Sequence, residues 1–148
     1  MPKKNSKIGI SSNVSWTIQK GSWLVHFVIT GLITLLFTQA FGRNKGLQLA
    51  LILYNCSSFL FFHWIVGDPF NAEYKDFTFW EQMNIQLEDS SSLTFMALYP
   101  IFLFFAVHRL VEWEKPLFFI ASISLLFVVI PKLGFMHMKR VFGIKRYD

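Results

Sequence analysis

The sequence contains a single cysteine, Cys56, within its 148 residues. One cysteine cannot form an intrachain disulfide or a paired thiolate ligand set, so a disulfide-stapled fold and a cysteine-rich zinc site are excluded. The sequence also has no G-x-S-x-G elbow, no glycine-rich phosphate loop, and no H-x-x-H or H-E-x-x-H pair among its four histidines. These absences favour a binding or regulatory protein over an enzyme. We predict no catalytic residues, no metal site and no cofactor.

Charge is also scarce within long stretches of the chain. Charged residues make up 16% of the sequence and apolar residues 53%, and the apolar residues gather in four blocks of nearly uncharged sequence. About 20 apolar residues in a helix cross the hydrocarbon core of a bilayer. We therefore predict an all-α, polytopic membrane protein with four transmembrane helices, at about 22–41, 47–66, 93–111 and 117–136.

The segments between these blocks indicate how the predicted spans are connected. Short polar turns at 42–46 and 112–116 predict two helical hairpins, which form a single membrane domain over 1–148. The net charge of +5 comes largely from lysines and arginines outside the spans, near the two ends of the chain. The positive-inside tendency then predicts that both termini are cytoplasmic. We expect 1–20 to be a flexible cytoplasmic segment and 137–148 a cytoplasmic tail.

The polar interval 67–92 separates the two predicted hairpins and holds six of the nine acidic residues. Within it, Thr78 and Glu81 have the spacing of a capping box, which marks the start of a helix. The apolar residues Trp80, Met83 and Leu87 then follow near one helical stripe. We predict a short amphipathic helix on the cytoplasmic side, and we expect its acidic surface to pack against the chain's own basic segments or a partner.

Several polar residues lie inside the predicted spans. Asn55 is costly against lipid, so it should face a neighbouring helix. Pro131 and Lys132 interrupt the fourth span near its end, where the Lys132 ammonium can reach the headgroups. His63, near the end of the second span, could be a catalytic base or ligand. A packed, hydrogen-bonded histidine is the simpler interpretation.

Four segments together resemble the Orm/ORMDL family of endoplasmic reticulum membrane proteins. They are K-G-S-W-L at 20–24 with Asn13 before it, F-F-H-W-I-V-G-D-P-F at 61–70, W-E-Q-M-N at 80–84, and I-P-K-L at 130–133 followed by R-V-F-G-I at 140–144. Their order and spacing match the family pattern over nearly the whole chain. The family has N-P-N where this chain has Ser11-Ser12-Asn13, so one asparagine and the proline are missing.

This resemblance implies a function that composition and spacing do not. Orm-like proteins are four-span, non-catalytic subunits that restrain serine palmitoyltransferase when ceramide is abundant, and the pyridoxal phosphate belongs to that partner. By resemblance, Asn13 contacts the ceramide headgroup, Phe61 packs on the bound lipid, and His63 belongs to the same ceramide site. A further set is expected at the partner interface: Trp80, Glu81, Gln82, Met83, Pro131 and Lys132.

The N-terminal serines add a possible regulatory feature. Fungal relatives carry N-terminal serines whose phosphorylation relieves inhibition, and Ser6, Ser11, Ser12 and Ser15 lie near lysines here. An ordinary disordered tail is an equally good interpretation. Two other functions stay open at this point: a small lipid-modifying membrane enzyme that uses His63 and Glu81, and a structural assembly or trafficking adaptor in the endoplasmic reticulum.

Overall fold

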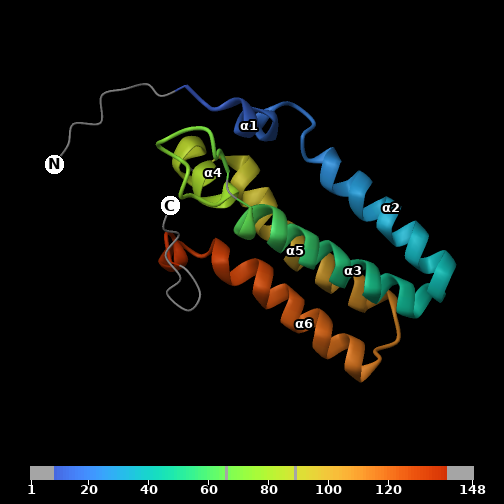
Figure 1. The fold of residues 1–148 in the computed structure, drawn as a ribbon. Coiled ribbons are helices and arrows are strands. Elements are labelled where there is room, and N and C mark those ends of the chain that lie inside the picture. Colours follow the sequence, from blue (N-terminus) through green and yellow to red (C-terminus); the bar gives the residue numbers. More distant parts are fainter. Residues whose placement is uncertain (1–8, 66, 89, 140–148) are drawn as a thin grey trace.

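The computed structural model describes residues 9–65, 67–88 and 90–139, and these residues form helices and turns without a strand (Figure 1). Within these residues two short turns of helix come first, and long helices separated by a loop follow. In chain order they are α1 (Ser12–Ser15), η1 (Trp16–Ile18), α2 (Leu24–Phe41), α3 (Arg43–Phe59), η2 (Leu60–Trp64), α4 (Phe79–Leu87), α5 (Ser91–Leu110), α6 (Lys115–Val129), η3 (Ile130–Lys132) and η4 (Gly134–Met136).

Four helical stretches are long and apolar enough to cross a membrane, as the sequence predicted. They are Leu24–Phe41, Arg43–Trp64, Ser91–Leu110 and Lys115–Lys132. The all-α membrane fold is therefore confirmed, while two boundaries differ from the prediction. The turn expected at 42–46 is reduced to Gly42, because α3 already begins at Arg43. The fourth stretch ends earlier than predicted, since Pro131 closes it in a 3-10 turn.

The four long helices alternate in direction around α3 (Figure 1). Helix α3 packs against α2, α5 and α6, and α5 also packs against α6. Gly46 allows a close approach to α2, because a Cβ at this position would collide with the backbone of Phe37 and Thr38. Buried Asn55 donates from its amide nitrogen to the Ser124 hydroxyl at 3.0 Å, so it faces α6 as predicted. Helix α3 is thus the centre of the bundle.

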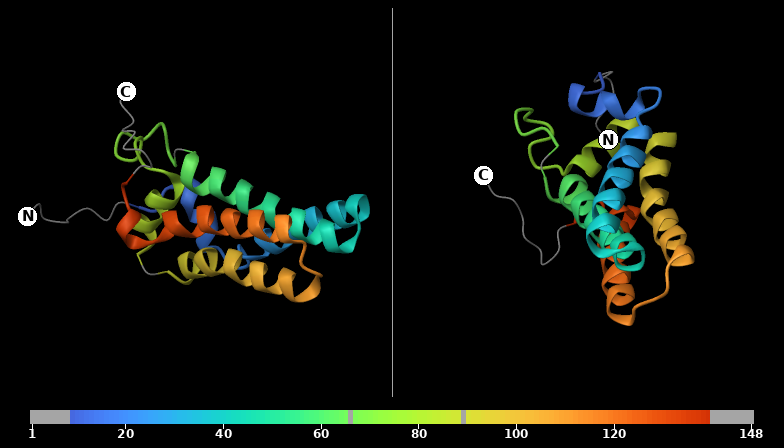
Figure 2. Two further views of the ribbon diagram at one scale, coloured as in Figure 1. Left: turned by 90° about the horizontal axis from the view of Figure 1, so that it is seen from below. Right: turned by 90° about the vertical axis from the view of Figure 1, so that its right-hand side faces the viewer.

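The N-terminal segment differs from the flexible chain that its composition suggested. Residues Ser12–Ile18 form α1 and η1, and the side chains of Val14 and Thr17 are fully buried. The segment turns back across the end of the bundle that also holds α4, which two further views confirm (Figure 2). The expected Ser6 and the R-V-F-G-I motif at 140–144 lie outside the described residues.

Two clusters of buried apolar side chains hold the described part of the molecule together. The α4-end core joins residues of α1, η2, α4 and α5, namely Val14, Phe62, Phe79, Trp80, Met83, Leu87, Leu93 and Met96. The three-helix core joins α3, α5 and α6 through Leu51, Phe104, Val107 and Ala121. Only the first of these two clusters brings together the N-terminal segment, η2 and α4, which hold Asn13 and the motifs at 61–70 and 80–84, so the candidate functional site lies there.

Candidate functional site

Helix α4 is the platform of this end of the molecule. Its start is fixed by the predicted capping box: the Thr78 amide donates to the Glu81 carboxylate at 2.9 Å, and the Glu81 amide donates to the Thr78 hydroxyl at 3.3 Å. Such reciprocal bonds satisfy amides that lack partners within the helix. Both faces of α4 are covered, because Glu81 and Gln82 are buried together with Trp80 and Met83.

Asn13 is held by hydrogen bonds between α4 and the loop that precedes it. Its amide nitrogen donates to the Gly67 carbonyl at 2.6 Å and to the Gln82 side-chain oxygen at 2.8 Å. The Gln82 amide nitrogen lies 3.2 Å from the Asn13 side-chain oxygen and donates to it. Two primary amides therefore pair with each other. An asparagine amide has two donor hydrogens and two acceptor lone pairs, so one lone pair of the Asn13 oxygen has no donor among the described residues.

Gly67 is required for this arrangement. A Cβ built on Gly67 would collide with the Gln82 side chain. The Gly67 amide also donates to the Phe77 carbonyl at 3.0 Å, and the Phe79 amide donates to the Ile65 carbonyl at 3.2 Å. These backbone bonds hold the chain after η2 against the start of α4. The position of the Gly67 carbonyl, and with it that of Asn13, is therefore set by the loop.

Further polar contacts fasten the N-terminal segment on both sides of Asn13. The Ser11 amide donates to the Gln86 side-chain oxygen at 3.1 Å, and the Gln86 amide nitrogen donates to the Ser11 hydroxyl at 2.7 Å. Beyond Asn13, the hydroxyls of Ser22 and Ser92 donate to the Thr17 carbonyl at 2.7 and 2.8 Å. The segment is thus docked by side-chain hydrogen bonds on α4 and α5, around the buried Val14.

The C-terminal side of the bundle also meets α4. The Met138 amide donates to the second carboxylate oxygen of Glu81 at 3.0 Å. Lys132 donates to the Met96 carbonyl at 2.7 Å, and its ammonium lies 5.4 Å from the ring centre of Phe62 and 5.3 Å from that of Trp80. The prediction that Lys132 reaches outward to the headgroups is wrong, because aromatic rings and a helix carbonyl attract the cation inward.

The π-helical turn η2 positions the two other residues expected at a ceramide site. The Ile65 amide donates to the Leu60 carbonyl at 3.0 Å, which widens the end of α3 by one residue. The Phe61 ring is 44% exposed and lies against Phe79, while His63 packs beside Trp80. The Nε2 atom of His63 is buried without a hydrogen-bond partner in the described part. Asn13 and Phe61 thus border the same α4-end core.

The residues predicted for a partner interface are mostly interior in this chain. Trp80, Glu81, Gln82 and Met83 are each at most 5% exposed, and Pro131 and Lys132 are half-buried. A direct role at a partner surface stays a prediction. Their contacts within the chain confirm a different expectation, that the polar surface of α4 packs against the chain's own segments. It does so through the side-chain amides of Gln82 and Gln86 and through the Glu81 carboxylate, which accepts from the Met138 backbone amide.

The three candidate phosphorylation sites differ in their surroundings. Ser12 is exposed, whereas Ser11 is half-buried and hydrogen-bonded to Gln86. The Ser15 hydroxyl is half-buried and donates to the Ser12 carbonyl at 3.0 Å. A phosphate at Ser11 would disrupt the Gln86 pairing, and one at Ser12 would extend into solvent. Whether any of them is modified stays a prediction.

The residues considered for catalysis do not form a catalytic arrangement in the described part. The Glu81 carboxylate accepts from two backbone amides, and no hydrogen bond joins it to His63. No group of three His, Cys, Asp or Glu side chains gathers closely enough to hold a metal ion among the described residues. What this end can do chemically is offer amide donors and acceptors next to exposed aromatic surface.

Sequence reasoning missed the residues that hold Asn13 in place. Neither Gln86 nor Gly67 was among the predicted site residues. The pairing of Gln82 with Asn13 spans 69 positions and leaves no local sequence signal. Glutamines at positions 82 and 86 are one turn apart on α4, which was the available hint that one face meets a polar partner.

Comparisons with known proteins agree on one family. The model of the ORMDL family matches residues 11–140. The chain is 31% identical to ORM1-like protein 2 of Homo sapiens over 144 residues, which covers 93% of this chain and 94% of that protein. It is 30% identical to ORM1-like protein 1 of Homo sapiens with the same coverage. An uncharacterized protein of Schizosaccharomyces pombe is 30% identical over 139 residues, or 90% of this chain and 75% of that protein.

Proposed function

The chain belongs to the ORMDL family, and from this premise we propose that it is a ceramide-responsive negative regulatory subunit of serine palmitoyltransferase. In this role it resides in the endoplasmic reticulum membrane with both termini in the cytoplasm. It performs no chemistry itself, and the partner enzyme holds the pyridoxal phosphate. The names of the relatives are not those of enzymes, and the two human relatives cover nearly its whole length, which supports a shared role.

The docked position of Asn13 is the observation that carries the proposal. Its side chain is fixed by Gln82 and Gly67 and keeps one acceptor lone pair. A ceramide hydroxyl can donate to that lone pair without displacing either partner. The ligand would therefore add a hydrogen bond to the docked segment and would not compete with it. Binding that favours one of two conformations shifts the equilibrium toward it.

The apolar part of a ceramide would find its contact beside this headgroup position. The exposed Phe61 ring, which lies in η2 at the end of the Arg43–Trp64 span, is 5.1 Å from the Phe79 ring between centres. An acyl or sphingoid chain that packs on Phe61 stays within the bilayer. A tenfold preference for the docked state corresponds to about 1.4 kcal/mol, which one hydrogen bond and one aromatic contact can supply.

A docked N-terminal segment provides the switch in this proposal. When ceramide is bound, the segment stays on α4 and the partner enzyme is restrained. When ceramide is scarce, the segment leaves more readily and inhibition weakens. Phosphorylation of Ser11 would act in the same direction, because a phosphate cannot keep the two-bond pairing with Gln86.

The proposal is tested by purifying the chain with its partner from mild detergent. We expect serine palmitoyltransferase subunits to co-purify and added ceramide to lower the activity of the complex. Asn13→Ala should keep assembly and weaken the ceramide response by about tenfold in half-inhibitory concentration. Asn84→Ala is the matched control, since Asn84 is half-buried on α4 and has no side-chain hydrogen bond in the described part.

Two results would contradict the proposal. If no serine palmitoyltransferase subunit is recovered, the regulatory role fails as a whole. If assembly is intact and Asn13→Ala responds to ceramide like the unmodified chain, only the role of Asn13 fails. Lipid-modifying activity of the purified chain alone, abolished by His63→Ala, would instead establish the enzymatic alternative.

A further inference from the structure

The C-terminal end of the described chain forms a strap that contacts the start of α4. We use this name for residues 132–139, which begin at the end of η3 and include η4. Successive turns are closed by backbone bonds: the Met136 amide donates to the Leu133 carbonyl at 2.9 Å, and the Lys139 amide donates to the Met136 carbonyl at 3.0 Å. The strap therefore has a defined conformation that its own backbone maintains.

Both ends of the strap contact the first turn of α4. At one end the Lys132 ammonium lies 5.3 Å from the ring centre of Trp80 and donates to the Met96 carbonyl of α5 at 2.7 Å. At the other end the Met138 amide donates to the Oε1 atom of Glu81 at 3.0 Å. Trp80 and Glu81 are consecutive residues of α4, so the strap holds this turn at two adjacent points.

The backbone of Met138 has an unusual conformation at this contact. Its φ angle is +61°, and Met138 is the only residue other than glycine with a positive φ among the described residues. This left-handed region is costly for most side chains and least so for asparagine and aspartate. Such a conformation persists when surrounding contacts hold it. The bond to Glu81, a side chain that is 5% exposed, is a contact of this kind.

The Glu81 carboxylate serves two segments, one with each oxygen. Its Oε2 atom accepts from the Thr78 amide and completes the capping box, and its Oε1 atom accepts from the Met138 amide. Loss of either donor removes a charge-assisted hydrogen bond from a buried carboxylate, which is costlier than the loss of a neutral one. Release of the strap should therefore also destabilise the capped first turn of α4.

The same turn of α4 supports the N-terminal segment. Asn13 donates to the Gly67 carbonyl and to the Gln82 side chain. Gln82 follows Glu81 directly in the sequence, and the Gly67 amide donates to the Phe77 carbonyl just before the capping box. A change at the start of α4 thus displaces both acceptors of Asn13.

We propose that Glu81 is a positioning residue that couples the C-terminal strap to the N-terminal segment. While the Met138 amide is bonded to Glu81, the first turn of α4 keeps the geometry on which Asn13 docks, and when the strap leaves, this docking weakens. Coupling between two binding events is reciprocal, so weaker docking of Asn13 loosens the strap by the same factor. The coupling belongs to this chain alone, whereas its effect on a partner enzyme rests on the proposed function.

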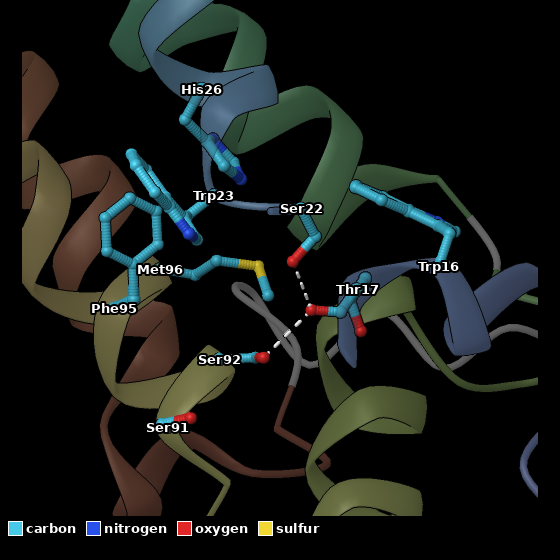
Figure 3. A pocket seen from close by; sticks show the side chains of 9 residues that line it. All are labelled: Trp16, Thr17, Ser22, Trp23, His26, Ser91, Ser92, Phe95 and Met96. Atoms are coloured by element: carbon cyan, nitrogen blue, oxygen red, sulfur yellow. Dashed lines mark hydrogen bonds between the residues drawn. The ribbon is translucent and has the colours of Figure 1, made fainter. Parts of the chain in front are cut away.

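The N-terminal segment has a second anchor that does not involve α4. Figure 3 shows the hydroxyls of Ser22 and Ser92 bonded to Thr17, whose carbonyl accepts from them at 2.7 and 2.8 Å. These bonds join the segment to the starts of α2 and α5. Release of the strap should therefore loosen the chain around Val14 and leave the Ser22 amide nearly unchanged, which provides an internal control.

The coupling can be tested by amide hydrogen exchange of the full chain in phosphatidylcholine nanodiscs. Met138→Pro removes the donor and cannot adopt a positive φ, so we expect about threefold faster exchange of the Val14 amide, the effect of roughly one net hydrogen bond. Met138→Asn keeps the amide and tolerates the left-handed region, so exchange should not rise. Phe135→Ala, which shortens an exposed side chain of the strap, is the control.

Two further variants test Glu81 itself and the reverse direction. Glutamine serves in a capping box like glutamate, so Glu81→Gln should keep the bond to Thr78 and turn its side-chain nitrogen toward the Met138 amide. It should therefore act like Met138→Pro on the Val14 amide. Asn13→Ala should speed exchange of the Met138 amide by about the same factor, because the coupling is reciprocal.

In the complex with serine palmitoyltransferase, the coupling predicts a difference between two measurements. Met138→Pro should raise the half-inhibitory ceramide concentration about threefold. Inhibition at saturating ceramide should stay unchanged, because the ligand can still shift the segment to its docked state. A variant that fails to assemble would lose the maximal inhibition instead, and that result would overturn the positioning role in regulation.

The outcomes separate the coupling from the proposed function. Unchanged Val14 exchange in Met138→Pro, or an equal increase in Met138→Asn, would overturn the coupling. An increase that extends equally to the Ser22 amide would also overturn it, since the whole segment would then have loosened. If the exchange results are as expected and the unmodified complex does not respond to ceramide, the proposed function fails and the coupling is supported.

Discussion

The two buried cores of this chain are built in different ways. The three-helix core joins neighbouring spans through plain apolar contacts, with Ala121 fully buried at its centre. The α4-end core is surrounded by a shell of amide and hydroxyl hydrogen bonds, whose partners lie up to 75 positions apart. The first core is a scaffold maintained by packing, with the Asn55–Ser124 pair as a hydrogen bond between α3 and α6 beside it. The second depends on polar pairings that a ligand or a modification can replace.

This difference suggests where the molecule can change conformation. Net hydrogen-bond contributions are about 0.5–1.5 kcal/mol each, so a few of them hold a short segment only marginally. Tightly packed spans, in contrast, change between two conformations only when whole helices move. We therefore expect local opening at residues 11–18 while α3, α5 and α6 stay packed. The four predictions that follow test this contrast, in order of decreasing effect.

Gly67→Ala should give the largest effect, confined to the α4 end. The new methyl group collides with Gln82, which costs about 1–3 kcal/mol by overpacking, with a similar loss from unmade hydrogen bonds. Amide exchange of residues 11–18 should rise by more than tenfold, while exchange around Leu51 stays unchanged. Gly134→Ala is the control, since a Cβ there meets nothing within 4 Å. Unchanged exchange in Gly67→Ala would mean that the docking does not depend on this contact.

Ala121→Leu should destabilise the three-helix core and leave the α4 end nearly unchanged. Three extra carbons in a fully buried position cost about 1–3 kcal/mol, and they would weaken the packing of α6 on α3 and α5. Thermal unfolding in detergent should shift downward, with exchange of residues 11–18 little changed until the bundle unfolds. Ala40→Leu places the same group at an exposed position of α2 and should be neutral. Equal effects of the two variants would contradict a tightly packed three-helix core.

Gln86→Leu should loosen the N-terminal segment without a steric collision. It removes both hydrogen bonds to Ser11 at a partly exposed position, so we expect a loss of about 1 kcal/mol of docking free energy. Exchange of the Val14 amide should increase by about fivefold, less than in Gly67→Ala. Ser12→Ala, at an exposed neighbour of Ser11, is the control. If Gln86→Leu raised amide exchange more than Gly67→Ala does, the N-terminal segment would be held mainly through Ser11 and not through Asn13.

Asn55→Leu should have the smallest effect, although Asn55 is fully buried. Interhelical hydrogen bonds within membranes contribute on average about 0.6 kcal/mol, and the leucine restores apolar packing against α6. A double-mutant cycle with Ser124→Ala isolates the pair from the other contacts of each residue. A coupling well above about 1.7 kcal/mol would show that the spans, too, depend on polar pairing.

Much of the scaffold could be read from the sequence because its signals are local. Uncharged apolar blocks predicted four spans, and Thr78 with Glu81 predicted the start of α4, since capping depends on residues three apart. Asn55 was correctly placed against another helix because lipid cannot satisfy an amide. The motifs at 61–70 and 80–84 identified the family, although they did not show how their residues meet.

The functional end depends on contacts that no local signal encodes. The composition of residues 1–20 predicted a flexible segment, yet Val14 and Thr17 are buried because α4 and α5 provide a surface for them. Lys132 turns inward because the rings of Phe62 and Trp80 converge on it from two other elements. The length of the apolar spans and the capped start of α4 are thus determined by the sequence itself. The partner of each buried polar group is decided only when the tertiary structure brings distant donors and acceptors together, because a hydrogen bond depends on distance and direction in space.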